Sequence, residues 1–317
     1  MDVVTLGETM VVFTPEVSLS MRYAGSFSKR FGGAETNVAI GVTRLGHRAG
    51  WISKVGQDDF GKAMVAFVRG EGVDVSQVQF DDKHPTGLYF KEVKNGNNVN
   101  VQYYRKDSAA SQLCPDDLNE QYIASAKYLH ITGITPALSE SCKNSVFNAI
   151  EIAKKNGVKV IFDPNLRRKL WSEEVARKVL TEIAALSDII LPGVDEGRFM
   201  FGEDDPEKLG ELFLQLGPSL VIIKVGAKGA YYFTKEQSAL VNGFQVNQVI
   251  DPVGAGDAFA AGVISGLLNN LPVDEVVKMG NAVGALATMT LGDFEGLPEK
   301  TELENFMSHT YSEDIQR

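Results

Sequence analysis

The chain has few of the residues that build disulfide frameworks or histidine-based metal centres. Its 317 residues include only two cysteines, Cys114 and Cys142. That number is too low for a disulfide-stapled secreted fold, so we expect a protein of the reduced cytoplasm. The four histidines, at 47, 84, 130 and 309, show no ligand spacing such as His-x-x-x-His, which argues against a histidine metal site.

Positive charge and long apolar runs are also scarce. Lys and Arg total 31 against 41 Asp and Glu, a net charge of −10, so we expect no basic face for nucleic acid. A local basic pocket for a small anion stays compatible with this balance. No apolar run approaches the length of a membrane span, and a strand pattern rather than a signal peptide begins at Asp2. We therefore expect no membrane partner.

What the chain does contain is a regular alternation of strand and helix patterns. Helical runs separate apolar runs at 49–56, 127–133, 158–164, 188–192 and 220–226. This alternation predicts an α/β fold with a doubly wound, mostly parallel sheet. Ligands of such sheets bind at the C-terminal ends of the strands. Because no flexible linker or repeat divides the chain, we expect a single domain over 1–317.

Two stretches, about 10–33 and 73–106, interrupt the alternation because strand patterns follow one another there without a helix. In the second, "TGLYFKEV" and "VNVQYYRK" flank the turn-rich "KNGNN", which predicts a β-hairpin with Asn95-Gly96 at its turn. We expect these excursions to form a small β-sheet lid over the strand ends. An apolar face of the lid offers a surface for a second subunit, so a homo-oligomer is expected.

The first glycine-rich motif, "GQDDFGKA" at 56–63, matches the P-loop pattern only in part. Ala63 stands where that motif has the Ser or Thr that binds magnesium. In addition, Asp58 and Asp59 would lie inside the phosphate nest. We interpret the motif as a strand-to-helix turn with acids at the start of a helix.

The second motif is the glycine pair Gly32-Gly33, which opens "RFGGAETNVAIGVTRLG" at 30–46. Helical spacing begins at Thr36. Glycine lets backbone approach a ligand closely, but a tight turn explains the pair equally well. Taken alone, this motif leaves both interpretations open.

The third motif, "DPVGAGDAFAAGVISGLL" at 251–268, leads from a glycine-rich turn into a helix. Such a turn binds anions, because free backbone N–H groups and the helix dipole both favour negative charge. Asp257 would repel a phosphate there, yet a positioned carboxylate can accept the proton of an attacking alcohol in phosphoryl transfer. The N–H groups of 254–257 could meanwhile stabilise the developing charge. The structural alternative is an early-turn acid that complements the dipole.

Together the second and third motifs resemble those of the ribokinase-like (PfkB) carbohydrate kinases, over nearly the whole chain. The resemblance implies a ribokinase-like α/β fold with a β lid. It also implies ATP and magnesium as cofactors, Asp257 as the catalytic base, and an anion hole of Gly254, Ala255 and Gly256. Further nucleotide contacts are implied at Asn165, Lys224, Gly226, Gly229, Gly254, Gly256 and Asn281.

Two points about ions follow from the same resemblance. The family's Asn-x-x-Glu motif reads Gly193-Val194-Asp195-Glu196 here, so the implied magnesium role of Glu196 lacks its asparagine. Activation by a monovalent cation near Asp251 stays an open alternative.

Within the family, "GGAE", "YYRKDSAAS" at 103–111 and "DPNLRRKLW" at 163–171 most resemble kinases of 2-keto-3-deoxygluconate. Strand alternation puts Arg105 on an otherwise apolar face, and Arg167 follows the C-terminal end of a strand. Two guanidiniums match the carboxylate of a sugar acid, although each arginine taken alone is better explained as a solvated or internally paired side chain. The resemblance implies sugar contacts at Gly33, Asn37, Tyr89, Tyr103, Arg105, Ile134, Arg167 and Asp257.

Two other functions compete with a sugar-acid kinase. A neutral-sugar kinase of the same fold, such as a fructokinase, would leave both arginines without a substrate carboxylate. A catalytically inactive sugar- or nucleotide-binding regulator is less favoured, because Asp257 and its glycines are present. A dinucleotide oxidoreductase is disfavoured, because no G-x-G-x-x-G follows the first strand.

Overall fold

The structure is a computed structural model that describes residues 1–16, 20–94 and 98–309. Its main sheet has nine strands in the order β13-β12-β11-β10-β9-β8-β1-β4-β5. All neighbours from β5 to β11 are parallel, and β12 and β13 extend the sheet in antiparallel fashion. The strands are β1 (Val3–Leu6), β4 (Ala49–Gly56), β5 (Asp74–Asp81), β8 (Tyr128–Thr132), β9 (Lys159–Asp163), β10 (Ile189–Ile190), β11 (Leu220–Lys224), β12 (Gly229–Phe233) and β13 (Ser238–Asn242).

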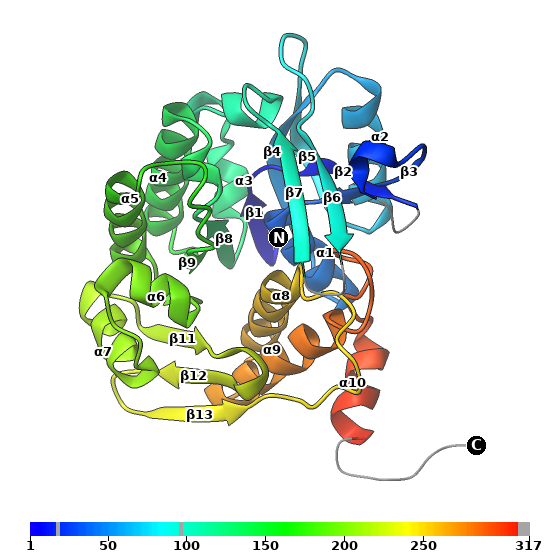
Figure 1. Ribbon diagram of the computed structural model, residues 1–317. Coiled ribbons are helices and arrows are strands. Elements are labelled where there is room, and N and C mark those ends of the chain that lie inside the picture. The colour runs from blue at the N-terminus through cyan, green and yellow to red at the C-terminus, as the bar shows by residue number, and fades with distance from the viewer. Residues whose placement is uncertain (17–19, 95–97, 310–317) are drawn as a thin grey trace.

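Helices cover both faces of the main sheet (Figure 1). One face packs against α1 (Ala34–Arg44), α2 (Asp59–Gly70), α8 (Ala255–Leu268), α9 (Val273–Ala287) and α10 (Lys300–His309). The other packs against α3 (Glu120–Ala124), α4 (Glu140–Lys155), α5 (Glu173–Leu186), α6 (Val194–Phe201) and α7 (Pro206–Leu216).

Successive side chains of β9 show why both faces need covering. Ile161 belongs to the first apolar core, whereas Val160 and Phe162 belong to the second. A strand that is apolar on both sides must be buried on both sides. The predicted doubly wound, mostly parallel sheet is therefore confirmed.

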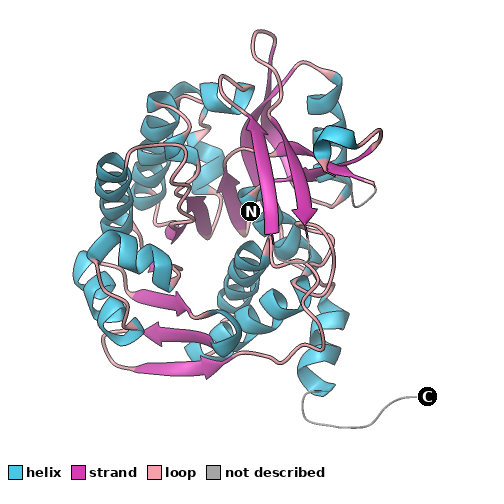
Figure 2. Cartoon of the chain, in the orientation of Figure 1, coloured by secondary structure: helices cyan, strands magenta, loops and turns pink. Residues whose placement is uncertain are grey.

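A second, smaller sheet stands beside the main one, with its strands in the order β3-β2-β6-β7 (Figure 2). Its strands are β2 (Met10–Pro15), β3 (Phe27–Gly32), β6 (Leu88–Lys94) and β7 (Asn98–Tyr104). β6 and β7 pair antiparallel as predicted, while the expected Asn95-Gly96 turn lies outside the described residues. The small sheet is thus confirmed as an element of the fold.

The expected second segment of the small sheet, 73–106, was too long at its N-terminal end. β5 (Asp74–Asp81) lies within that range but pairs in parallel with β4 as the edge strand of the main sheet. No helix separates β5 from β6, so the local pattern resembled two strands of one sheet. The apolar–polar alternation within one strand does not show which other strand it pairs with, because pairing depends on residues far away in the sequence. The segment of the small sheet therefore begins at Leu88.

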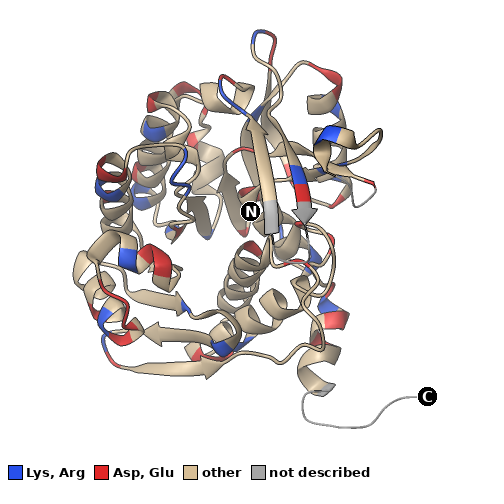
Figure 3. Ribbon diagram, in the orientation of Figure 1, with Lys and Arg blue, Asp and Glu red and all other residues tan. Residues whose placement is uncertain are grey.

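Four expectations about features outside the site can be checked here. Asp58 accepts hydrogen bonds from the backbone of Gly61 and Thr86, each at 2.8 Å, so the P-loop-like motif is a helix cap as interpreted. Cys114 and Cys142 are both free. In the view of Figure 3, basic and acidic residues are interspersed over the helices. No helix of the described ranges is long and apolar enough to cross a membrane.

Candidate active site

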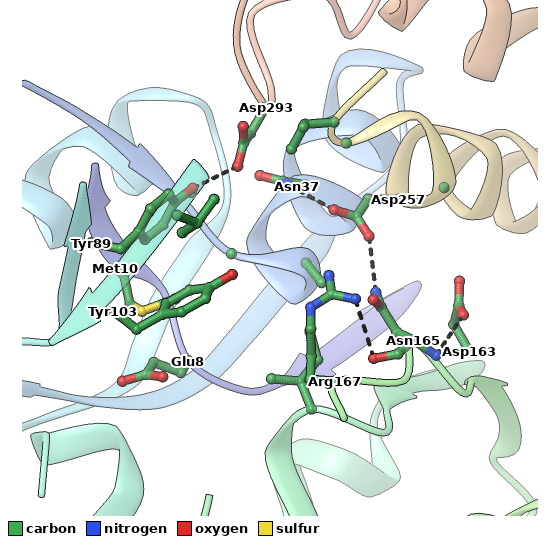
Figure 4. Close-up of a pocket in the computed structure, with 18 of the residues that line it drawn as sticks. Glu8, Met10, Asn37, Tyr89, Tyr103, Asp163, Asn165, Arg167, Asp257 and Asp293 are labelled. Atoms are coloured by element: carbon green, nitrogen blue, oxygen red, sulfur yellow. Dashed lines mark hydrogen bonds between the residues drawn. The ribbon is translucent and has the colours of Figure 1, made fainter. Parts of the chain in front are cut away.

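A cavity of about 210 Å³ lies where the C-terminal ends of β1, β8, β9 and β11 meet the N-terminus of α8 and the small sheet. The position agrees with the rule that parallel sheets bind ligands at their C-terminal edge. Figure 4 shows tyrosines of the small sheet on one side and Asp257 with the loop after β9 on the other. The predicted residues that line the cavity are Gly33, Asn37, Tyr89, Tyr103, Arg105, Ile134, Asn165, Arg167, Glu196, Lys224, Gly254, Gly256 and Asp257.

A second cavity, of about 400 Å³, adjoins the first. Lys224 and Gly256 line both, so the two spaces meet at the start of α8. The remaining predicted residues line this second cavity: Gly226, Gly229, Ala255 and Asn281. The Nδ2 of Asn281 donates to the carbonyls of β13 residues at 3.0 and 3.2 Å, which fixes the orientation of its amide. Two ligands could therefore meet end to end at Gly256.

Asp257 lies in the first turn of α8, between two asparagines that both donate to it. Asn37 Nδ2 is 2.8 Å from Asp257 Oδ2, and Asn165 Nδ2 is 3.4 Å from Oδ1. Burial raises the pKa of Asp257 to about 6, against the lowering effect of the Asn37 hydrogen bond. At neutral pH the carboxylate is thus ionised, held in place, and more basic than an ordinary aspartate.

The turn before α8 requires glycine at one position and leaves space at another. Gly254 has a φ of +82°, and a Cβ there would lie 2.3 Å from the carbonyl oxygen of Asp293. At Gly256 a Cβ would meet nothing closer than Lys224 Nζ at 3.9 Å. The N–H of Ala255 donates to Pro252 at 3.3 Å. First-turn N–H groups have no acceptor within a helix, so those of Gly256 and Asp257 are available to a ligand.

Lys224 supplies a cation where the two cavities meet. Its Nζ lies 2.7 Å from Asp163 Oδ2. Burial lowers the pKa of Lys224, but the negative charges of Asp163 and Glu196 outweigh that effect and raise it overall. Asp163, at the end of β9, had no assigned role in the sequence analysis. The sequence pattern that could have indicated this residue is "FDPN", in which an acid stands at the C-terminal end of a buried strand.

Glu196 holds two loops together through its carboxylate. Its Oε2 accepts from the N–H of Gly193 at 2.7 Å, and its Oε1 from that of Leu166 at 3.0 Å. Burial is the main cause that raises its pKa. No group of three or more His, Cys, Asp or Glu residues in the described ranges could hold a metal ion. A magnesium ion here would depend on substrate phosphates and water for most of its ligands.

Arg105 is an internally paired arginine, one of the alternatives that the sequence left open. It is buried, with Nε 2.7 Å and Nη2 2.5 Å from Glu8 Oε2. Ser108 Oγ donates to the other oxygen of Glu8 at 2.5 Å. Glu8 lines the cavity, but the sequence analysis did not name it as a site residue. Its position, two residues after the first buried strand, could have indicated a role in the site. Arg105 can donate to a ligand only through the guanidinium N–H groups that do not already bind Glu8.

Arg167 presents a freer guanidinium to the same cavity. It is exposed, and among the described residues its Nη1 reaches only the backbone carbonyls of Asn165 and Leu166, both at 3.5 Å. No carboxylate forms an ion pair with it in the ranges that the structure describes. In Figure 4 its side chain lies between Tyr103 and Asn165. It is therefore the arginine best placed to bind an anionic ligand.

The small sheet contributes aromatic side chains to the cavity wall. Tyr89 donates through its hydroxyl to Asp293 Oδ2 at 2.9 Å, and its ring centroid lies 5.4 Å from that of Tyr103. Ile134 also lines the cavity. Its N–H already donates to Thr132 and its carbonyl accepts from Ala137, each at 3.0 Å, so both of its backbone groups have internal partners.

Comparison with known proteins agrees with this architecture. Residues 1–300 match the model of the pfkB family carbohydrate kinases. The chain is 41% identical over 310 residues to the 2-dehydro-3-deoxygluconokinase of Bacillus subtilis (strain 168), with 97% of this chain and 96% of that protein covered. It is 34% identical to fructokinase-1 of Zea mays, with 95% and 96% covered.

A solved structure of a candidate ribokinase II from E. coli, in complex with ATP and Mg²⁺, superposes with a TM-score of 0.91 at 28% identity. The alignment covers 97% of this chain and 99% of that one. Sequence and structure thus agree over almost the whole length. The chain belongs to the pfkB family of carbohydrate kinases and is a sugar kinase.

Proposed function

We propose that the protein transfers a phosphoryl group from ATP to 2-keto-3-deoxygluconate, giving 2-keto-3-deoxy-6-phosphogluconate. The observation that carries this proposal is a single cavity lined by the half-buried Asp257, whose pKa is raised, and by Arg167, which has no carboxylate partner among the described residues. A base and a free guanidinium suit a substrate that has a hydroxyl and a carboxylate. The name of the Bacillus subtilis relative supports the same substrate.

In this proposal Asp257 accepts the proton of the sugar hydroxyl as its oxygen attacks phosphorus. Asn37 and Asn165 hold the carboxylate in position. The N–H groups at the start of α8 and the ammonium of Lys224 stabilise the charge that develops on the transferred group. When bound, ATP with magnesium supplies the phosphoryl group and neutralises part of its charge.

The residues of the site are better suited to bind a nucleotide than to ligate a metal ion directly. The second cavity is of nucleotide size, and Gly256 leaves its backbone open at the junction with the first. Gly226, Gly229, Ala255 and Asn281 would line the bound nucleotide. Glu196 already accepts two backbone hydrogen bonds, so we place it as a support for the loops around magnesium, acting through water.

We further propose that the small sheet acts as a lid on the bound sugar. It supplies Tyr89 and Tyr103 to the cavity, and it contacts the rest of the site through the hydroxyl of Tyr89 on Asp293. Closure would exclude water, which would otherwise accept the phosphoryl group.

A neutral sugar is the second candidate substrate, and one contact favours it. Arg105 already has a carboxylate partner in Glu8, so only one of the two predicted arginines is free to bind a substrate acid. The Zea mays fructokinase-1 relative points the same way.

A coupled ADP-release assay over gluconate-derived 2-keto-3-deoxy acids, fructose and ribose distinguishes the two candidates. We expect kcat/KM for 2-keto-3-deoxygluconate to exceed that for fructose by about tenfold or more, because a neutral sugar leaves Arg167 unpaired. The preferred sugar should also slow hydrogen exchange in 88–94 and 98–104. A preference for fructose would reject the proposed substrate, and unchanged exchange would reject the lid.

The anion hole predicts a selective effect at Gly256. Gly256→Val fills open space at the junction of the cavities, so the melting temperature should stay close to wild type while kcat/KM for ATP falls by about 10²–10³. Gly70→Val is the matched control, because a Cβ there likewise enters open space, with nothing within 4 Å, and the residue ends a distant helix. Wild-type kinetics in a folded Gly256→Val variant would contradict the assignment.

A further inference from the structure

Lys91 is a buried lysine that bridges two acids beside the glycine turn. It extends from β6 of the small sheet, with Nζ 2.7 Å from Asp251 Oδ2 and 3.3 Å from Asp293 Oδ1. Only 6% of the Lys91 side chain is exposed, against 3% and 11% for the two acids. Lysine is almost never buried to this degree unless it is paired, so the contact is a specific one.

Asp251 also holds the backbone around the turn that precedes Asp257, and Asp293 packs against that turn. Asp251 Oδ1 accepts from the N–H of Val253 at 3.1 Å, and its Oδ2 accepts from that of Gly292 at 3.3 Å. The carbonyl oxygen of Asp293 packs against Gly254, within 2.3 Å of the position a Cβ would take. The carboxylate of Asp251 thus connects the turn with the segment that packs on it.

This arrangement depends on the ammonium. Two carboxylates that share one cation would repel each other in its absence, so they would move apart or turn toward water. Either change would disturb the hydrogen bonds to Val253 and Gly292. The position of the turn, and with it the direction of the N–H groups at the start of α8, therefore relies on a positive charge between Asp251 and Asp293.

We propose that Lys91 is a positioning residue for the anion hole, a cation built into the chain that makes a dissolved monovalent cation unnecessary at this place. The inference rests on the proposed function, because the turn it positions is the proposed anion hole. Tyr89, two residues earlier on the same face of β6, donates to the other oxygen of Asp293. The small sheet thus supplies both the charge and a second hydrogen bond to the same pair of acids.

If Lys91 is truncated, the activity of the protein should come to depend on a cation from solution. Lys91 lines both the first cavity, the proposed sugar cavity, and a neighbouring cavity of about 270 Å³, so Lys91→Ala opens a path for small ions. We expect kcat in tetramethylammonium chloride to fall by about tenfold or more, with a smaller change in the KM of the sugar. Potassium or methylammonium should restore a substantial part of kcat and raise the melting temperature of this variant.

Three controls make the result specific. The wild type should turn over equally in potassium and in tetramethylammonium chloride. Lys91→Arg should retain most of kcat, because it keeps the charge. Lys29→Ala removes an exposed lysine from β3 of the same sheet and should change neither kcat nor the response to cations.

Strong activation of the wild type by potassium would overturn the inference, as would a Lys91→Ala variant with wild-type kcat. A loss that no cation restores in the folded variant would also overturn it, because it would show a role for the side chain other than its charge. If Lys91→Ala does not fold, the wild-type comparison and Lys91→Arg still decide. A wild type that phosphorylates none of the sugars tested would reject the proposed function instead.

Discussion

Asp257→Asn should lower kcat by about 10²–10⁴ while the fold and most of the affinity for ATP are retained. The amide keeps the shape of the side chain but cannot accept the proton of the attacking hydroxyl. Turnover by the coupled assay, ATP binding by calorimetry and the melting temperature together measure the three quantities. Asp59→Asn, an exposed acid-to-amide change on α2, is the matched control and should leave turnover unchanged.

The same substitution should change how stability depends on pH. Burial raises the pKa of Asp257 from 3.8 to about 6, so the folded protein binds this proton more tightly than the unfolded chain does. The stability that the bound proton contributes is therefore present below pH 3.8 and is lost as the pH rises through about 6. We expect Asp257→Asn to raise the melting temperature relative to wild type at pH 8 and to lose that advantage near pH 4. Near-native turnover in this variant would reject Asp257 as the base.

The second large effect is expected at Arg167. A charge-assisted contact is worth about 1.5–3 kcal/mol, so Arg167→Ala should raise the KM of the sugar acid by roughly 10–150-fold. In the proposed substrate the reacting hydroxyl lies at the end opposite the carboxylate, so this contact would hold ground state and transition state alike and kcat should change little. Arg167→Lys should recover only part, because an ammonium cannot form the two-pronged contact. Arg168→Ala is the matched control, since Arg168 is the adjacent exposed arginine and does not line the sugar cavity.

A cycle between protein and ligand identifies what Arg167 binds. Reducing the substrate carboxylate to an alcohol should cost the wild type heavily and Arg167→Ala little. Arg105 is less suited to this test, because Arg105→Ala leaves the buried carboxylate of Glu8 without its partner and mixes stability with binding. If Arg167→Ala discriminates acid from alcohol as strongly as wild type does, Arg167 does not bind the carboxylate. A neutral-sugar kinase would then become the better proposal.

Residues whose role follows from local backbone chemistry could be predicted from the sequence. The "GAGD" turn is one case: glycines directly before a helical pattern predict open N–H groups, and the structure places Gly256 at the junction of two cavities. The strand–helix alternation likewise predicted the main sheet, because each strand carries its own apolar pattern. The antiparallel strands β12 and β13 at its edge were not anticipated as part of that sheet.

Contacts between segments far apart in the chain were decided only by the tertiary structure. The sequence by itself determined the family of folds, the glycine turn with its acid, and the arginines near the site, since these depend on short patterns. It did not determine that Glu8 pairs with Arg105, that Lys91 joins Asp251 to Asp293, or that β5 belongs to the main sheet. Each of these contacts joins segments that are far apart in the sequence. A buried charge needs a partner and a strand edge needs a neighbour, but only the folded chain determines which residue or strand lies close enough to provide it.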